Sequence, residues 1–452
     1  MIPSHRDWIS RQLGSVVTGT VRERQSFEYF HRHIGHELSS ALRIDPAYGF
    51  ILQASQSDDV VKSAVIAIGS MGQRLRINQL LTSDNQQANA LQEFAQVQYC
   101  KALNQLQARM GNDPEQSTEL AIIACFLFTI LEFLQGNEVD ALVHLRSGLS
   151  ILRREKGFQE PTDPLRMEIS EIFSIMDRQA TWWLGLKSFQ SPVIVPIENL
   201  APAPLSFSEF QNLDEAAGAL NYHLTQMYHF RRCVTASDPT LRNIPQEAYT
   251  QQKEMLDQLE RWPAGFATLL SSLNEAFVDV EIIHRAAVMQ MNYRTIFVLL
   301  SSCFEGYGEQ RSNVSYETDF QLILSLAKSV VGTTEDSTKG SIERVVAANN
   351  RGRNPVPLFT FHAGVIQPLY ILAITCRDLN MCQEAIALLS AKPWREGAWD
   401  SFSMAMIAKR RIQQLKDQGY YDNEHAMSSC ISTNALNPIN DGATSRRWSS
   451  QT

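Results

Sequence analysis

Three histidines, His31, His33 and His36, form the one histidine cluster in the sequence. Imidazole is the commonest protein ligand of transition metals, and a zinc site needs a fourth ligand or a water together with supporting hydrogen bonds. On a helix, steps of two and three residues do not bring three side chains to one face. The spacing therefore favours surface or boundary histidines, and no metal-ligating residue is predicted.

The adjacent carboxylates of Asp58 and Asp59 are a second candidate, because aspartate pairs hold magnesium in some helical enzymes. A third carboxylate would fall about three residues later in such a motif, and that position is occupied by Lys62. An acidic cap at the start of a helix explains the pair better, since carboxylates stabilise the unpaired backbone amides of a first turn.

Motifs of the common catalytic classes are absent from the sequence. It has no Gly-x-Ser-x-Gly nucleophile elbow, no phosphate-binding loop and no Gly-x-Gly-x-x-Gly after a strand. Cys376 and Cys382 are too far apart for a CxxC redox pair, and their apolar neighbours favour core packing. We therefore expect no catalytic residue, no cofactor-binding residue and no cofactor, and the chain is not expected to be an enzyme.

Glu132 is the most informative single residue, because it lies inside the apolar stretch "IIACFLFTILEFLQ". A carboxylate buried in a core needs a hydrogen-bonding or charged partner. His144 or Arg146 on the following helix could supply one. The position favours a structural clamp between two helices over a catalytic acid or base.

The elements that hold these residues belong to a globular chain of ordinary composition. It has 452 residues, of which 44% are hydrophobic and 19% charged, and its net charge is −8. This acidity argues against a basic footprint for nucleic acid over the whole protein. The apolar run 121–134 is about 14 residues long, short of the roughly 20 that span a bilayer, and no membrane partner is expected. Seven scattered cysteines, none before Cys100, favour free thiols in a reducing compartment.

Hydrophobic periodicity predicts an all-α fold, a large multi-helix domain built from packed helical hairpins, because apolar residues recur at steps of three and four and strand patterns are nearly absent. The predicted helices are 21–42, 57–75, 90–110, 117–134, 138–156, 165–186, 207–236, 246–261, 273–304, 318–331, 357–379, 381–389 and 398–417. Gly136 is expected to end one helix of the clearest hairpin in a left-handed cap.

The chain is predicted to divide into a loose leader (1–19), one helical domain (20–420) and a disordered tail (421–452) rich in Ser, Asn and Thr. The tail has too few apolar groups to offset the entropy lost on ordering. It contains the basic pair Arg446-Arg447, a weak match to a nuclear import signal.

Four stretches resemble the regulatory domain of fungal binuclear-zinc-cluster transcription factors, the fungal-specific transcription factor domain. They are "RERQSFEYFHRHIGHELS", "ILQASQSDDVVKSAVIAIGSMGQ", "IIACFLFTILEFLQGNEVDALVHLRSGLSILRR" and "PLYILAITCRDLNMCQEAIALLSAKPWREGAWDS". The third is the most specific, because it joins the Glu132 segment to His144-Leu145 and Gly148-Leu149 at the family's positions. The resemblance implies that Glu132, His144 and Gly148 determine the fold, with Gly148 permitting close helix contact.

The sequence departs from this family in one respect. Family members of this kind carry an N-terminal module in which six cysteines, including two CxxC pairs, share two zinc ions and place a helix in the major groove. Here no CxxC exists and the resemblance begins almost at Met1. No DNA-binding or zinc-ligating residue is therefore predicted, and we expect no stoichiometric zinc and only weak, sequence-independent DNA binding.

The resemblance implies a nuclear, transcription-regulator-like protein without its own zinc cluster. Such a chain would control or co-regulate a fungal secondary-metabolite gene cluster through contacts with the transcription machinery or with a zinc-cluster relative. Two alternatives stay open: a helical module that senses a small metabolite, and a truncated gene model of a full zinc-cluster transcription factor.

Overall fold

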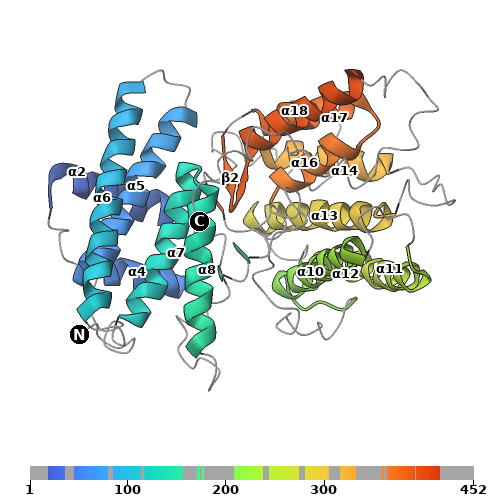
Figure 1. The fold of residues 1–452 in the computed structure, drawn as a ribbon. Helices are drawn as coiled ribbons and strands as arrows, with labels where there is room; N and C mark the ends of the chain where they lie inside the picture. Colours follow the sequence, from blue (N-terminus) through green and yellow to red (C-terminus); the bar gives the residue numbers. More distant parts are fainter. Residues whose placement is uncertain are drawn as a thin grey trace. The chain divides into compact units, whose positions relative to one another are not determined.

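The computed structural model describes most of the chain between Gly19 and Asp417 and places it almost entirely in helices, which confirms the all-α prediction (Figure 1). The described residues are 19–35, 45–79, 85–112, 117–155, 169, 172–173, 176–177, 208–237, 244–273, 280–304, 316–331, 359–360, 364–391 and 393–417. The predicted tail 421–452 lies outside them, as does the predicted leader up to residue 18 and nearly all of the predicted helix 165–186.

The chain divides into two compact units. Unit 1 comprises Met1–Ala180, Pro357–Ala363 and Lys392–Asp400, and unit 2 comprises Thr181–Val356, Gly364–Ala391 and Ser401–Thr452. The single helical domain predicted over 20–420 includes parts of both units and stays a prediction.

Unit 1 is built around α5, which contacts α2, η1, α4, α6 and α7. Its elements are α2 (Val21–Tyr29), the π-helix η1 (Phe30–Ile34), α4 (Asp45–Ser57), α5 (Asp59–Gln79), α6 (Asn85–Asn112), α7 (Thr118–Gln135), α8 (Glu138–Glu155), β1 (Phe359–Thr360), β2 (Arg395–Glu396) and β3 (Trp399–Asp400). The strands form one small sheet in the order β1-β2-β3, parallel and then antiparallel.

The α7–α8 hairpin forms as predicted. Every residue of α7 from Leu120 to Leu134 is buried, and Gly136 ends the helix with a φ of 83°. At 18 residues, α7 is long and apolar enough to cross a membrane, yet 83% of it is buried within the protein, as in the core helix of a globular domain. Its all-round apolar surface is explained by helices that cover it on several sides.

Two glycines of α5 allow the start of the chain to pack closely on this helix. A Cβ atom at Gly69 would lie 1.9 Å from the backbone oxygen of Ser26 in α2, and one at Gly72 would lie 2.6 Å from Cδ1 of Ile34. Glycine is required where two backbones approach this closely. Phe27, Phe30 and Ile34, which recur at steps of three and four residues, are buried.

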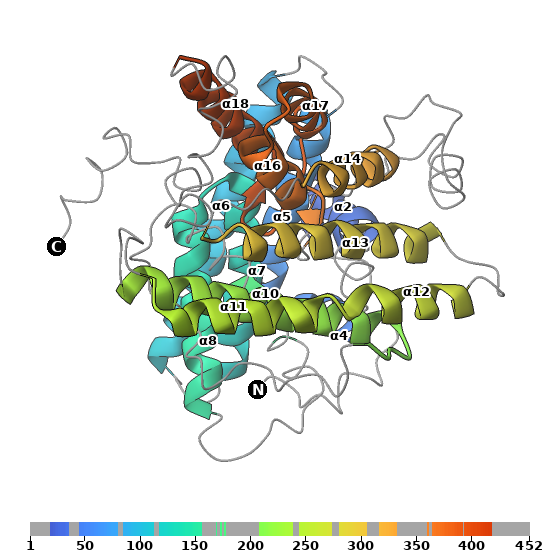
Figure 2. The same ribbon diagram turned by 90° about the vertical axis from the view of Figure 1, so that its right-hand side faces the viewer.

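Unit 2 is centred on α13, which lies between α10–α12 on one side and α14 and α16 on the other (Figure 2). Its helices are α10 (Leu213–Ser237), α11 (Gln246–Leu259), α12 (Trp262–Leu273), α13 (Val280–Ser301), α14 (Glu317–Val331), α16 (Ile366–Thr375), α17 (Leu379–Leu389) and α18 (Ser401–Asp417). Trp262 anchors α12, because its ring stacks on Phe266 and Tyr293 while its Nε1 donates to the Ala216 oxygen at 2.9 Å.

Several predicted helix boundaries are wrong. The predicted helix 207–236 begins only at Leu213, because the Asn212 side chain accepts hydrogen bonds from the backbone amides of Asp214 and Glu215, both at 3.0 Å, and so caps the helix there. The predicted helix 273–304 is instead the end of α12 followed by α13. The predictions 357–379 and 398–417 each include residues of the small sheet, and the helices begin at Ile366 and Ser401. Helices α4 and α12 were not predicted.

Acid is expected to weaken unit 2 through His223 on α10, which is 3% exposed. Burial lowers the pKa of its imidazole to about 4, from an ordinary value of 6.5. The unfolded chain therefore binds a proton at a higher pH than the folded chain, so stability is complete above the unfolded pKa and falls as the pH drops toward the folded one. Between pH 7 and pH 5 this single group should cost about 2 kcal/mol.

Urea unfolding of the wild type and of His223→Gln at both pH values measures this contribution. The variant should lose clearly less stability on acidification, with a remainder because burial also lowers the pKa of His144 and His284. Equal losses in the two proteins would show that His223 is not the group responsible.

Candidate functional site

A polar cluster joins three helices of unit 1, and we call Tyr99, Glu132, Asn137 and His144 the hairpin cluster. Tyr99 and Glu132 are buried, His144 is half-buried and Asn137 is exposed. The hydroxyl of Tyr99 on α6 lies 2.7 Å from Nε2 of His144 on α8 and also hydrogen-bonds the carboxylate of Glu132 on α7. The side-chain amide of Asn137 donates a hydrogen bond to Oε2 of Glu132 at 2.7 Å. Glu132 is 3% exposed, so these contacts replace the water that its carboxylate loses.

Burial sets the protonation states of the hairpin cluster. It raises the pKa of Tyr99, as do the hydrogen bond to Glu132 and the negative charge of that carboxylate. It also lowers the pKa of His144, against a smaller opposing effect of Asp140. At neutral pH the tyrosine thus keeps its proton and the imidazole is uncharged. In the contact between the Tyr99 oxygen and Nε2 of His144, the histidine tautomer decides which group donates the hydrogen.

The expectation that Glu132 has a polar partner is confirmed, but the two residues expected to bind it directly were the wrong ones. His144 reaches the carboxylate only through Tyr99, and Arg146 is exposed. The direct partners are Asn137, in the tight turn after α7, and Tyr99, on α6. The geometry ties α6 to both helices of the hairpin, which is the chemistry of a structural clamp.

Gly148 has the close contact that the resemblance implied. A Cβ atom there would lie 2.5 Å from Cζ of Phe173, a fully buried ring, so the absent side chain is what admits the aromatic ring. The ring also meets Phe126 of α7 edge-on, with centroids 6.1 Å apart.

Arg395 connects the small sheet to the α7–α8 turn. Its guanidinium lies 3.3 Å from Oε1 of Glu138 at the start of α8 and 3.4 Å from Oδ2 of Asp400, while the side chain is only 9% exposed. Gly397, with a φ of 56°, supplies the positive angle that a two-residue hairpin loop needs between β2 and β3. The sequence analysis did not predict this hairpin. A usable signal was the Gly397-Ala398 dipeptide, since glycine favours a tight turn and a tryptophan stands close on each side of it.

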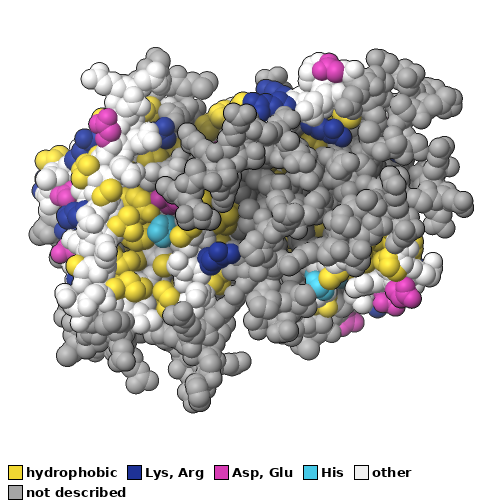
Figure 3. All heavy atoms as spheres, in the orientation of Figure 1, with side chains coloured by type: hydrophobic (Ala, Val, Ile, Leu, Met, Phe, Trp, Pro, Cys, Tyr) yellow, Lys and Arg dark blue, Asp and Glu magenta, His cyan; other side chains and the backbone are white. Residues whose placement is uncertain are grey.

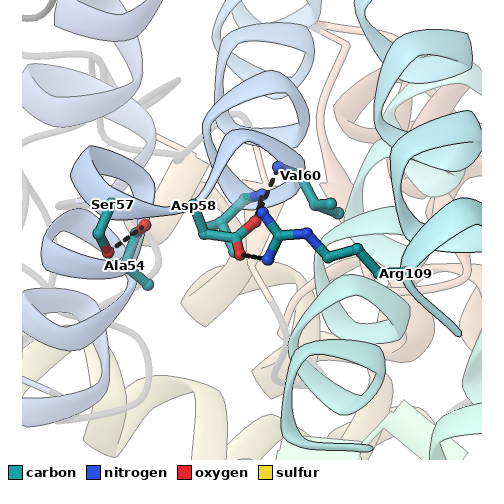
Figure 4. A network of polar contacts seen from close by, with 6 residues as sticks. Ala54, Ser57, Asp58, Val60 and Arg109 are labelled. Carbon is teal, nitrogen blue, oxygen red and sulfur yellow. Dashed lines mark hydrogen bonds and ion pairs between the residues drawn. The ribbon is translucent and has the colours of Figure 1, made fainter. Parts of the chain in front are cut away.

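Asp58 acts as a helix cap, as predicted. Its Oδ1 accepts from the Val60 amide at 2.8 Å, and its second oxygen forms an ion pair with Arg109 of α6 (Figure 4). Ser57, the last residue of α4, donates from its hydroxyl to the Ala54 oxygen at 3.3 Å. Asp59 is exposed at the first position of α5, so the two carboxylates point to different surroundings.

The histidines and cysteines that the structure describes have no metal-binding geometry. His31 and His33 are exposed on η1, the ring of His33 lies 4.6 Å from that of Tyr29, and His36 lies outside the described residues. In the part of the chain that the structure describes, no three His, Cys, Asp or Glu side chains are grouped to hold a metal ion. Cys376 and Cys382 are buried, as predicted, but their thiols are also in hydrogen-bond contact, which the sequence spacing did not indicate.

Comparison with known proteins points to fungal transcription regulators. No protein-family model matches the chain, and no solved structure matches it. Two proteins of similar sequence are named as transcription regulators. The aspercryptin biosynthesis cluster-specific transcription regulator atnN of Emericella nidulans is 23% identical over 444 residues, covering 81% of this chain and 70% of that protein. The transcription regulator lscL of Purpureocillium lilacinum is 28% identical over 109 residues, 23% of this chain and 25% of that protein.

Proposed function

We propose that this chain regulates transcription of a fungal biosynthetic gene cluster, in the nucleus and through contacts with other proteins. The observation that carries the proposal is the alignment with atnN, which covers 81% of this chain and therefore extends over both units. The regulator that it aligns with is named for one biosynthesis cluster, so the proposed targets are genes of a single pathway.

Charge supports the protein-contact part of the proposal. A net charge of −8 disfavours binding to the phosphate backbone, because such binding depends on the release of counterions by clustered Lys and Arg. A chain of this kind would reach its target genes through a DNA-bound partner, either a zinc-cluster relative or a component of the transcription machinery.

Deletion of the gene is expected to change transcript levels of its chromosomal neighbours, with normal levels restored by the wild-type gene. A fluorescent fusion at the native locus should accumulate in the nucleus. Transcripts that are unchanged under conditions in which the pathway is active would contradict the regulatory role. Tight, sequence-selective binding of a promoter duplex by the purified chain would contradict the protein-contact mechanism and leave the regulatory role intact.

A further inference from the structure

The surface of unit 2 carries a groove of about 400 Å³ between α17 and α18. Its apolar lining comes from Ile386, Ala387 and Ile412. Polar side chains complete the lining, and they are Gln383, Ser390, Lys409 and Gln413. An apolar floor with polar edges, formed by two neighbouring helices, is the shape that receives one face of a third helix.

The outer face of α18 extends this lining with exposed apolar side chains. Phe402 is 39% exposed and Met406 is 57% exposed. With Lys409 and Gln413 they follow steps of four, three and four residues, which places all four on one stripe of the helix. Phe402 is the one aromatic residue among the large hydrophobic side chains that are exposed in the described part of the chain. Aromatic and methionine side chains are enriched at protein interfaces.

The same helix is basic within an acidic chain. It holds Lys409, Arg410, Arg411 and Lys416 against Asp417, a net charge of 4 − 1 = +3. Lys and Arg side chains are visible over α18 at the top of Figure 3. Among the described residues no acid pairs with Lys409 or Arg410. The nearby acids are engaged, because Glu384 of α17 pairs with Lys328 and Asp417 accepts from Gln413 at 2.8 Å.

We propose that the groove between α17 and α18 binds an acidic amphipathic helix of a partner protein. The apolar face of that helix would pack on Ile386, Phe402 and Met406, and its carboxylates would lie against Lys409 and Arg410. The proposal rests on the protein-contact function above and gives that function a surface and a partner chemistry. Exposed apolar side chains on the stripe favour a peptide over nucleic acid, and the charge of +3 opposes the α18 face of a second copy.

The probe is a fluorescein-labelled helical peptide with Leu and Phe at i, i+3, i+4 and i+7 and with Asp and Glu at the remaining positions. Fluorescence anisotropy measures its binding to the full chain. A peptide of the same composition, with its apolar residues spread around the helix, separates groove binding from simple charge attraction. We expect saturable binding of the first peptide and at least about tenfold weaker binding of the second.

Met406→Glu and Lys409→Glu should each weaken binding about tenfold or more, because each places a like charge against the acidic peptide. Met110→Glu, at a 40% exposed methionine of α6, is the matched control and should bind as the wild type does. All three positions are exposed, so circular dichroism should show unchanged folding; if one groove variant fails to fold, the other still tests the proposal.

Three results would overturn the inference: no saturable binding, equal binding by the wild type and both groove variants, or displacement of the peptide by duplex DNA at equal concentration. A fall in molecular mass from dimer to monomer on Met406→Glu, measured by light scattering, would assign the groove to a second copy instead. These outcomes concern purified protein and are independent of the transcript measurements, so failure of the groove proposal leaves the regulatory role to its own test.

Discussion

Replacing Gly69 by alanine is expected to lower the free energy of unfolding by about 2 kcal/mol. The new methyl carbon would lie 1.9 Å from the backbone oxygen of Ser26 and 2.8 Å from its carbonyl carbon. Backbone cannot rotate away as a flexible side chain does, so α2 must move off α5, an overpacking cost of about 3 kcal/mol. The higher helix propensity of alanine returns about 1 kcal/mol of this.

The resistance of α2 to such movement comes from its own contacts. Thr20 and Glu23 form a reciprocal capping box at its start, and Glu23 also accepts from Gln98 of α6 at 3.1 Å. Urea unfolding of Gly69→Ala against Gly111→Ala measures the effect. A Cβ atom at Gly111, also in unit 1, has nothing within 4 Å, so that variant should be neutral or slightly stabilising. Equal stability of the two variants would mean that α2 does not pack on α5 through backbone contact.

The order and type of most helices followed from the sequence, and the two unpredicted helices share a physical cause. Pro46 and Pro263 stand at the second position of α4 and α12, and a glycine follows each within three residues. Both residue types suggest a break in a helix. Proline, however, is tolerated in a first turn, where its missing N–H would have no partner. Gly265 is explained by packing, because a Cβ atom there would lie 2.2 Å from the oxygen of Ser208.

Partners of the candidate site residues were harder to predict than the residues themselves. The apolar residues on both sides of Glu132 in the sequence indicate that its carboxylate is buried, because burial can be inferred from neighbouring positions. Tyr99 precedes it by 33 positions on another helix, and such a pairing depends on how helices cross, which periodicity does not encode. The two-residue strands β2 and β3 escaped prediction for a related reason, because alternation cannot be recognised over so short a length.

Cys376 and Cys382 of unit 2 illustrate the same limit at shorter range. Cys376 follows the end of α16 and Cys382 lies in the first turns of α17. The Asp378 side chain accepts from the Asn380 amide at 2.7 Å and caps α17, which turns the chain sharply. Because of this turn, Cys382 lies next to Cys376, and its Sγ donates to the Cys376 backbone oxygen at 3.3 Å. Sequence spacing alone could not show that a six-residue separation would become a contact.

Removal of the hairpin cluster's carboxylate is the second large effect we expect. Glu132→Leu keeps the side chain's approximate volume but deprives the Asn137 amide of its acceptor at 2.7 Å and Tyr99 of its carboxylate partner. The Tyr99 hydroxyl is buried, so the loss of its carboxylate partner costs about 1–3 kcal/mol, whereas the exposed Asn137 amide can turn to water. The variant no longer has to bury the charge of Glu132, which offsets part of this cost. The free energy of unfolding should therefore fall by about 2 kcal/mol.

A double-mutant cycle with Tyr99→Phe separates a connected network from independent contacts. Tyr99→Phe alone should cost about 1 kcal/mol, because His144 and Glu132 each lose the hydroxyl. Each single variant already loses the contact between Tyr99 and Glu132, so the sum of the single losses counts this contact twice. The double variant should therefore be more stable than that sum predicts, by about 1 kcal/mol. Arg146→Ala is the control, since this exposed residue was expected from the sequence to bind Glu132 and should change stability by less than about 0.5 kcal/mol. Additive losses, or a large effect of Arg146→Ala, would contradict the clamp through Tyr99. They would support the earlier prediction that a residue of α8 binds Glu132 directly.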